Sequence, residues 1–261
     1  MSDYRATGVN DYVGVVMDFE TGGLNPNKNA ITQISISSFR IKDLKMMDKY
    51  VSFIKPYRKK VTSKKKLKNK FEEIDNSEPH IDECLEYEEK ALEYTNISIE
   101  DCIDKGLDIR EVADKCVTLI ENSRISKSKK HKPFFLGQNI QFDIGFWQQM
   151  MDYAGMDIQK RYEKAMSGIK DYYGNFQPHY VDTLDLARMK FGDNDNIDKY
   201  KLENIAARLG APIYDAHDAQ ADTDATFNVF AILSQQLRSG GISDIDGVIE
   251  KDKKARRTFN I

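Results

Sequence analysis

The stretch VGVVMDFETGG, residues 13–23, carries an apolar strand directly into two carboxylates, Asp18 and Glu20, and then breaks at two glycines. Because side chains alternate between the faces of a strand, Asp18 and Glu20 point the same way, with Cα atoms ~6.6 Å apart. Phe19 between them points to the other face and into the core. Two like charges at this separation raise each other's pKa, and a bound divalent cation reverses that penalty. The alternative is a strand that ends in two ordinary solvated acids.

Two more strands follow, within AITQISISSFRI (30–41) and DKYVSFIKP (48–56). Short polar turns separate the three, which favours an antiparallel meander. Apolar periodicity and glycine stops then predict a helix that opens near Ser98, a strand within 131–140, a helix at 141–155, a strand that turns into a helix at 179–189, and helices at 201–210 and 218–239. This order predicts an α/β fold with a mixed sheet, in which helices flank the antiparallel three-strand meander.

The 261 residues and 40% hydrophobic content can fill one sizeable core, so we expect a single domain over residues 1–240 and a charged C-terminal tail over 241–261. Residues at about 58–90 interrupt the domain. This range begins basic, ends acidic and has almost no apolar periodicity, which predicts a solvated insertion that is partly helical in its acidic half. The alternative is that its lysines, between residues 59 and 70, form a basic lip that holds phosphates of a substrate.

The net charge of −3 indicates no general affinity for nucleic acid, so such a contact has to be local or assisted by metal ions. The three cysteines form no CxxC pair and fit a reducing compartment, and with one candidate histidine this excludes a zinc site. The polar start of the chain lacks the apolar segment of a signal peptide, and no run approaches the ~18 apolar residues of a membrane span. We therefore expect a cytoplasmic protein with no membrane partner.

Two further carboxylates occur at boundaries between apolar and polar sequence. Asp143 begins an apolar helical face that continues through Phe146, Trp147 and Met150. A buried charge is costly, so Asp143 needs a cation or a close donor; the alternative is a first-turn acid that only favours the helix dipole.

The stretch HDAQADTDAT contains the other carboxylate, Asp222, together with His217. Five residues correspond to ~500° on an ideal helix, so His217 and Asp222 can act together only if His217 lies in the loop before the helix and Asp222 on its second turn. The alternative is a structural histidine. Four carboxylates and one histidine suit a two-metal phosphodiesterase, in which two Mg²⁺ or Mn²⁺ ions hold the attacking water and the leaving oxygen and the histidine takes the water's proton.

Five ordered motifs make the chain similar to the DEDDh branch of the DnaQ-like 3′–5′ exonucleases, which includes the epsilon subunit of DNA polymerase III, RNase T and oligoribonuclease. The motifs are MDFETGGL (17–24), GQNIQFDIGF (137–146), VDTLDLARM (181–189), KLENIAARLG (201–210) and AHDAQAD (216–222). The resemblance covers most of residues 12–236, with interruptions at 58–90 and roughly 156–178. It implies an RNase H-like fold with four metal ligands and a general base, His217. The implied ligands are Asp18, Glu20, Asp143 and Asp222.

The resemblance also implies contacts with the substrate. The main chain around Thr21 would meet the terminal nucleotide and its 3′-OH, Leu24 would wedge against the terminal bases, and Asn139 would contact the substrate. Two departures from the family pattern occur. Gly22 stands where a second threonine is frequent, which predicts a looser floor for the terminal sugar. Gln138 precedes Asn139 in place of the more usual histidine, which predicts an altered sugar or base contact and unaltered metals.

The leading hypothesis is an enzyme that releases nucleoside 5′-monophosphates from the 3′ ends of single-stranded or frayed DNA in proofreading or repair. The motifs ETGGL and KLENIAARLG are most similar to those of polymerase-associated exonucleases, so a DNA polymerase is a candidate partner. An exoribonuclease is the first alternative, because a 2′-OH contact cannot be identified from sequence. A non-catalytic nucleic-acid-binding module on the same fold is the second, and it predicts a broken acidic set.

Overall fold

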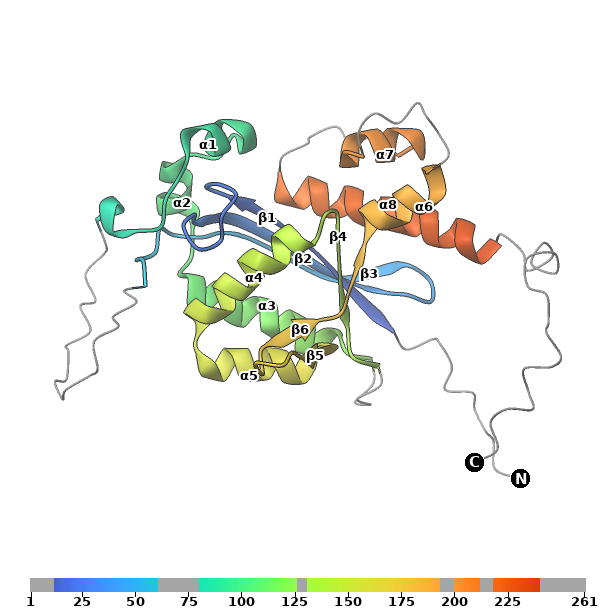
Figure 1. The fold of residues 1–261 in the computed structure, drawn as a ribbon, viewed down its shortest axis with the longest axis horizontal. Helices are drawn as coiled ribbons and strands as arrows, with labels where there is room; N and C mark the ends of the chain where they lie inside the picture. The colour runs from blue at the N-terminus through green and yellow to red at the C-terminus, as the bar shows by residue number, and fades with distance from the viewer. Residues whose placement is uncertain (1–11, 61–79, 126–130, 193–199, 212–217, 240–261) are drawn as a thin grey trace, which may run out of the picture.

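A five-stranded mixed sheet forms the centre of the protein in a computed structural model, which describes residues 12–60, 80–125, 131–192, 200–211 and 218–239 (Figure 1). The strand order is β3-β2-β1-β4-β7. The strands are β1 (Val13–Thr21), β2 (Ile31–Arg40), β3 (Lys45–Phe53), β4 (Phe134–Gly137) and β7 (Tyr180–Asp182). The first three pair antiparallel, as the sequence predicts, and β4 pairs parallel with both β1 and β7. The predicted mixed sheet with a three-strand meander is therefore confirmed.

Helices cover both faces of this sheet (Figure 1). One face packs against α3 (Ile109–Ser123), α4 (Gln141–Ala154) and α5 (Met156–Ala165), and the other lies beside α6 (Thr183–Phe191), α7 (Leu202–Arg208) and α8 (Ala219–Ser239). The alternation of β1 serves both layers. Its odd-numbered residues Val15 and Met17 join the core built with α3 and α4, whereas Val16 joins the core built with α8. Strand β1 is thus buried on both faces.

The region after β3 is more divided than the sequence predicts. It contains a 3₁₀ turn (Ile81–Glu83), α1 (Glu89–Thr95) and α2 (Ile99–Lys105) before α3. Helix α2 starts with the predicted capping box, in which Ser98 and Asp101 each accept the other's backbone N–H. A second cap, Asp108, accepts from the amide of Arg110 and starts α3, so one predicted helical region is two helices.

A small hairpin was not predicted. It consists of β5 (Gly168–Lys170) and β6 (Phe176–Pro178), which pair antiparallel outside the main sheet. The Asp171 carboxylate organises the turn between them by accepting from the amides of Tyr173 and Asn175. Three-residue strands carry almost no periodicity, which explains why the sequence gives no signal here.

The end of the predicted insertion is packed and extended, which differs from the expectation of a solvated, partly helical segment. Cys84 and Leu85 are buried, and residues before Glu89 are not α-helical. The backbone explains this order: the Glu86 carbonyl accepts from Ala30 N at 3.0 Å, and Glu88 N donates to the Gly22 carbonyl at 2.7 Å. Residues 61–79, with most of the lysines, and the tail 241–261 lie outside the described residues. No helix in the described parts of the chain is long and apolar enough to cross a membrane.

Gly22 lies against this segment. A Cβ atom at this position would meet the Glu86 carbonyl oxygen at 2.8 Å and Tyr87 Cα at 3.1 Å. The space that a second threonine would occupy is therefore filled by backbone, while the looser floor for the terminal sugar stays a prediction. Residues 86–88 pack where the side chain would otherwise lie.

We expect Gly22→Ala to lower the free energy of unfolding by ~1–3 kcal/mol, because backbone has to shift to admit the methyl group. Urea titration measures this change. Gly145→Ala is the control: it adds the same methyl group on α4, where the nearest heavy atom is the side-chain Cγ of Pro26 at 3.2 Å, and it should cost less. Equal stability of Gly22→Ala and the wild type would contradict the packing of residues 86–88 against Gly22.

Candidate active site

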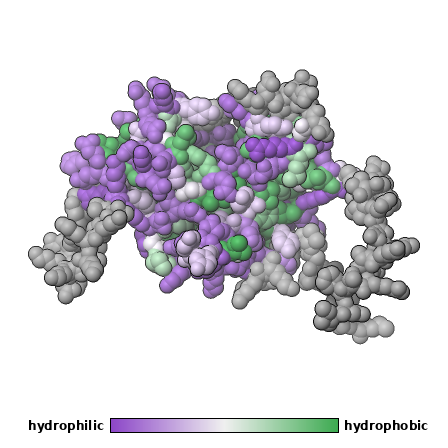
Figure 2. Space-filling model, in the orientation of Figure 1, coloured by the Kyte–Doolittle hydropathy of each residue, from purple (hydrophilic) through white to green (hydrophobic). Residues whose placement is uncertain are grey.

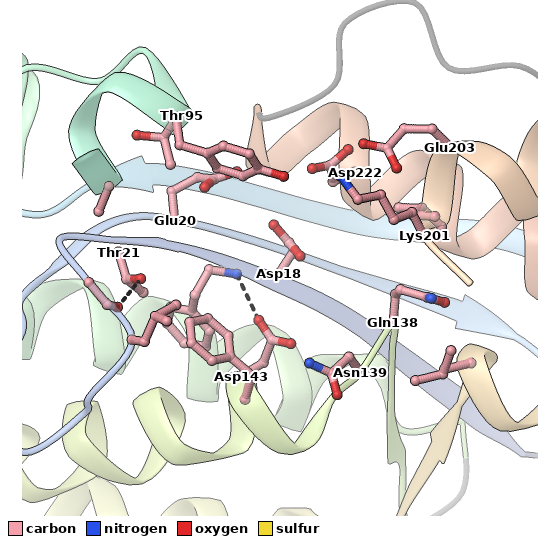
Figure 3. A pocket seen from close by; sticks show the side chains of 18 of the residues that line it. Asp18, Glu20, Thr21, Thr95, Gln138, Asn139, Asp143, Lys201, Glu203 and Asp222 are labelled. Atoms are coloured by element: carbon pink, nitrogen blue, oxygen red, sulfur yellow. Dashed lines mark hydrogen bonds between the residues drawn. The ribbon is translucent and has the colours of Figure 1, made fainter. Parts of the chain in front are cut away.

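Three carboxylates converge at the end of β1. Asp18 and Glu20 lie on the side of the strand that faces α8, and Asp222 lies in the first turn of α8 (Figure 3). One oxygen from each of the three lies within 4.8 Å of the others. The helix begins at Ala219, so Asp222 is in the first turn and not in the predicted second turn. The order of the chain, a strand end followed much later by a helix start, thus produces the convergence that the sequence predicts.

Asp143 approaches the same strand from the α4 side. Its side chain is only 3% exposed, in the first turn of α4, and its Oδ1 accepts from the backbone N–H of Phe19 at 3.1 Å. Figure 3 shows this hydrogen bond beneath β1. The buried carboxylate therefore has the close donor that the sequence analysis requires, and the donor lies between Asp18 and Glu20. Asp143 also sits in the first helical turn, so the two interpretations of this residue are compatible.

The carboxylates are electrostatically costly. Burial raises the pKa of Asp18 well above its ordinary value, and the charges of Asp143, Glu20 and Asp222 raise it further. Burial, followed by the charges of Asp222 and Asp218, raises the pKa of Glu20 to about 7. Burial also raises the pKa of Asp143, against the opposing effect of the Phe19 amide. Carboxylate oxygens are the ligands that Mg²⁺ and Mn²⁺ prefer, and such ions would neutralise this repulsion, so the donor set fits a divalent-metal site.

Residue His217 lies outside the described residues, so its role as general base stays a prediction. Its neighbour Asp218 is a helix cap: the carboxylate accepts from Gln220 N at 3.0 Å and Ala221 N at 3.1 Å. Asp224 forms an ion pair with Lys49 at 2.7 Å. Of the acids around Asp222, these two therefore have structural partners of their own.

An open cleft of about 1020 Å³ adjoins the carboxylates. The cleft is lined by the end of β1, residues 21–24, α1, the end of β4 and residues 200–203. Figure 2 shows that the apolar side chains on this face of the molecule lie among hydrophilic ones. The three residues predicted to contact substrate all line the cleft. Thr21 is buried and its hydroxyl donates to the Gly23 carbonyl at 2.7 Å, and Leu24 is 82% exposed. Asn139 has a φ of 55°, and its backbone N–H donates to Asp182 Oδ1 at 2.9 Å.

The loop that carries Leu24 is held by side-chain amides that sequence reasoning missed. Asn29 donates to Glu88 Oε1 at 3.0 Å and accepts from Asn25 N at 2.9 Å. Gln149 on α4 donates to the Asn29 carbonyl at 2.9 Å and accepts from the Tyr57 hydroxyl at 2.7 Å. A buried amide in an otherwise apolar helix face is the one signal that could have identified Gln149.

Gln138, the second departure from the family pattern, is also used internally. Its Nε2 donates to the Tyr200 carbonyl at 3.1 Å, and its Oε1 accepts from the Thr183 hydroxyl. The same Thr183 hydroxyl also lies 3.1 Å from the Gly137 carbonyl, so its single proton is shared between these two acceptors. The side chain of Gln138 thereby ties the end of β4 to the start of α6 and to the residue that precedes Lys201.

Comparison with known sequences finds curated relatives and no matching family model. The chain is 24% identical over 234 residues to the PolC-type DNA polymerase III of Thermotoga petrophila, and 23% identical over 237 residues to that of Staphylococcus haemolyticus. These matches cover 90% and 91% of this chain. They cover only 13% and 12% of the polymerases, so the chain spans about an eighth of the length of these relatives.

Comparison with solved structures finds exonuclease I. One such structure has a TM-score of 0.57 at 16% identity and covers 92% of this chain and 46% of its own. Escherichia coli exonuclease I in complex with a dT13 oligonucleotide also has a TM-score of 0.57, at 18% identity, over 87% of this chain and 42% of its own. This likeness shows the fold. The predicted RNase H-like exonuclease fold and the predicted resemblance to DnaQ-like exonucleases are confirmed.

The raised pKa of Glu20 predicts a pH dependence of stability in the metal-free protein. Between about pH 4.5 and about pH 7 the unfolded state loses the Glu20 proton and the folded state keeps it, so stability falls as pH rises. We expect the thermal midpoint of Glu20→Gln in EDTA to exceed that of the wild type by an amount that grows across this window and then levels off. Mg²⁺ should raise the wild-type midpoint more than that of the variant. A difference between the two proteins that is independent of pH would contradict this assignment.

Proposed function

We propose that the protein is a divalent-metal-dependent 3′–5′ exonuclease that removes nucleoside 5′-monophosphates from single-stranded or frayed DNA. The observation that carries this proposal is the convergence of Asp18, Glu20 and Asp222 within 4.8 Å beside an open cleft, with buried Asp143 beneath them. An intact acidic set favours catalysis over a non-catalytic binding module. A polymerase name on the relatives and a dT13 oligonucleotide in a structural neighbour support DNA over RNA.

The four carboxylates, Asp18, Glu20, Asp143 and Asp222, would hold two Mg²⁺ or Mn²⁺ ions. When bound, these ions supply charge neutralisation at the scissile phosphate and activation of the attacking water. In the absence of ions, the same carboxylates repel a phosphate, which makes activity depend on the divalent cation. The ligand set contains only oxygen atoms, which suits hard cations.

The remaining residues bind and orient the strand. Leu24, which is exposed in the loop after β1, would pack against the terminal base, and Thr21 and Asn139, which also line the cleft, would contact the strand. A water oxygen attacks phosphorus, and the bond from phosphorus to the 3′-oxygen of the preceding nucleotide breaks. His217 takes the proton of the attacking water, and the leaving 3′-oxygen gains a proton from solvent. The products are a nucleoside 5′-monophosphate and a strand shortened by one nucleotide.

We propose that this activity serves proofreading or repair, and that a DNA polymerase is the partner. The support is that the relatives are DNA polymerases, of which the match with this chain covers about an eighth. Time courses with Mg²⁺ on matched single-stranded DNA, duplex DNA with a frayed 3′ end, and RNA test the substrate. Faster cleavage of both DNA forms supports the proposal, and faster cleavage of RNA would assign the protein to the exoribonucleases.

The metal assignment predicts a separation of activity from stability. Asp18→Asn removes one ligand, so turnover should fall to the background, while the fold remains because the amide fits the same space. In the absence of metal, the thermal midpoint of Asp18→Asn should exceed that of the wild type, since the substitution decreases repulsion among the carboxylates. Asp224→Asn is a suitable control, because Asp224 pairs with Lys49 outside the acidic group. Wild-type turnover in Asp18→Asn would contradict the assignment.

The general-base assignment predicts a change in the pH–rate profile. A neutral imidazole accepts the proton, so the wild-type rate should climb as pH passes the pKa of His217. His217→Ala should lose ~10²–10⁴-fold in rate and retain Mg²⁺ binding, which calorimetry measures. If the variant keeps the same rising limb at nearly the same height at saturating Mg²⁺, His217 is structural and another group takes the proton.

A further inference from the structure

The cleft contains few positive charges to receive a polyanion. Six carboxylates line it, against three cationic side chains, Lys90, Arg188 and Lys201. Arg188 forms an ion pair with Asp185 at 3.2 Å. Lys90 and Lys201 form no ion pair with any residue that the structure describes. As far as the described residues go, these two ammonium groups are therefore available to a phosphate without first breaking an ion pair.

Lys201 is the better placed of these two lysines. Figure 3 shows its side chain on the side of the cleft formed by α7 and α8, beside Glu203 and directed toward Asp222. Lys90 also lines the cleft, but it belongs to α1, which lies apart from α7 and α8 (Figure 1). Two divalent cations would bring the four central carboxylates to neutrality, and Lys201 would then be the cation beside the phosphate on the α7 side. The backbone of Lys201 lies beside the cleft that adjoins the acidic group, and its side chain is exposed.

Gln138 helps to hold the backbone at Lys201 in place. Lys201 has an extended backbone with φ −71° and ψ 151°, and its carbonyl accepts from Ile205 N at 3.1 Å, which starts α7. The preceding carbonyl, that of Tyr200, accepts from Gln138 Nε2 at 3.1 Å. Gln138 is in turn oriented by the Thr183 hydroxyl. The Gln138 side chain therefore connects the backbone next to Lys201 to the end of β4.

We propose that Lys201 contacts a phosphate of the bound strand and that Gln138 is a positioning residue that acts through Lys201. This inference rests on the proposed function and adds a strand-binding pair to it. It names a phosphate contact that is independent of base identity, so it supports binding of any single-stranded sequence. Loss of the contact should weaken the strand's affinity and leave the chemistry at the carboxylates intact.

Binding of a 5′-labelled oligothymidylate, followed by fluorescence anisotropy, tests the proposal without relying on turnover. Ca²⁺ replaces Mg²⁺, and a gel verifies that the strand stays intact. Lys201→Gln should raise Kd about tenfold. It should also make the dependence of log Kd on log salt shallower by ~0.7, the value for one phosphate contact on a single strand. The control is Lys164→Gln, an exposed lysine on α5 that does not line the cleft, which should leave both quantities unchanged.

The role of Gln138 is tested by a double-mutant cycle with Gln138→Met, which preserves length and removes both hydrogen bonds. Alone, Gln138→Met should raise KM and Kd and leave kcat nearly unchanged. In the Lys201→Gln background it should add little, because the side chain that it positions is already lost. Gln138→Glu keeps an acceptor for Thr183, loses the donor to Tyr200 and adds a negative charge to the cleft, so it should raise Kd at least as much as Gln138→Met does.

Distinct outcomes separate this inference from the function on which it rests. If the wild type neither binds nor shortens the strand, both the function and the inference are wrong. If the wild type binds and Lys201→Gln binds with the same Kd and salt dependence, the function stands and the phosphate contact is wrong. Strictly additive effects in the cycle would show that Gln138 does not act through Lys201.

Discussion

Mutual repulsion among carboxylates at the end of β1 is the constraint on which the rest of this structure depends. A strand with both faces buried delivers Asp18 and Glu20 to the place where α8 begins, and α4 adds Asp143 from the other face. Burial makes each charge costly, as the raised pKa of Asp18 and that of Glu20 indicate. A folded chain tolerates this arrangement at a functional site, and the proposed divalent cations would offset the repulsion.

Side-chain amides, more than salt bridges, hold the parts of the site that surround these carboxylates. Asn29 and Gln149 connect the loop before β2 to α4 and to residues 86–88, and Gln138 connects β4 to the residues before α7. Amides can donate and accept at once, so each one bonds more than one polar group without adding charge near the acids. By contrast, most ion pairs of the described residues are solvent-exposed and contribute little to stability.

Much of this site could be predicted because its signals are local. The period of two at Asp18 and Glu20 and the period of 3.6 after Asp143 and Asp222 place each carboxylate on a known face, and these faces meet once the sheet order is known. The packed segment at 84–88 could not be predicted, since its order comes from backbone hydrogen bonds with residues 22–30 that leave no periodicity. The β5–β6 hairpin is too short to show a pattern. Gln138 shows the same limit: its residue type indicates a departure, and only the distance to Tyr200 assigns it a partner.

The direction and product of strand shortening test the central claim most directly. A single-stranded DNA labelled at its 5′ end is incubated with Mg²⁺, and the products are resolved by length while released nucleotides are identified by mass. The account predicts a ladder of labelled strands that shorten by one nucleotide at a time from the 3′ end, with nucleoside 5′-monophosphates as the released species. Release of the 5′ label as a mononucleotide, internal cleavage, or an intact strand at saturating Mg²⁺ would contradict it.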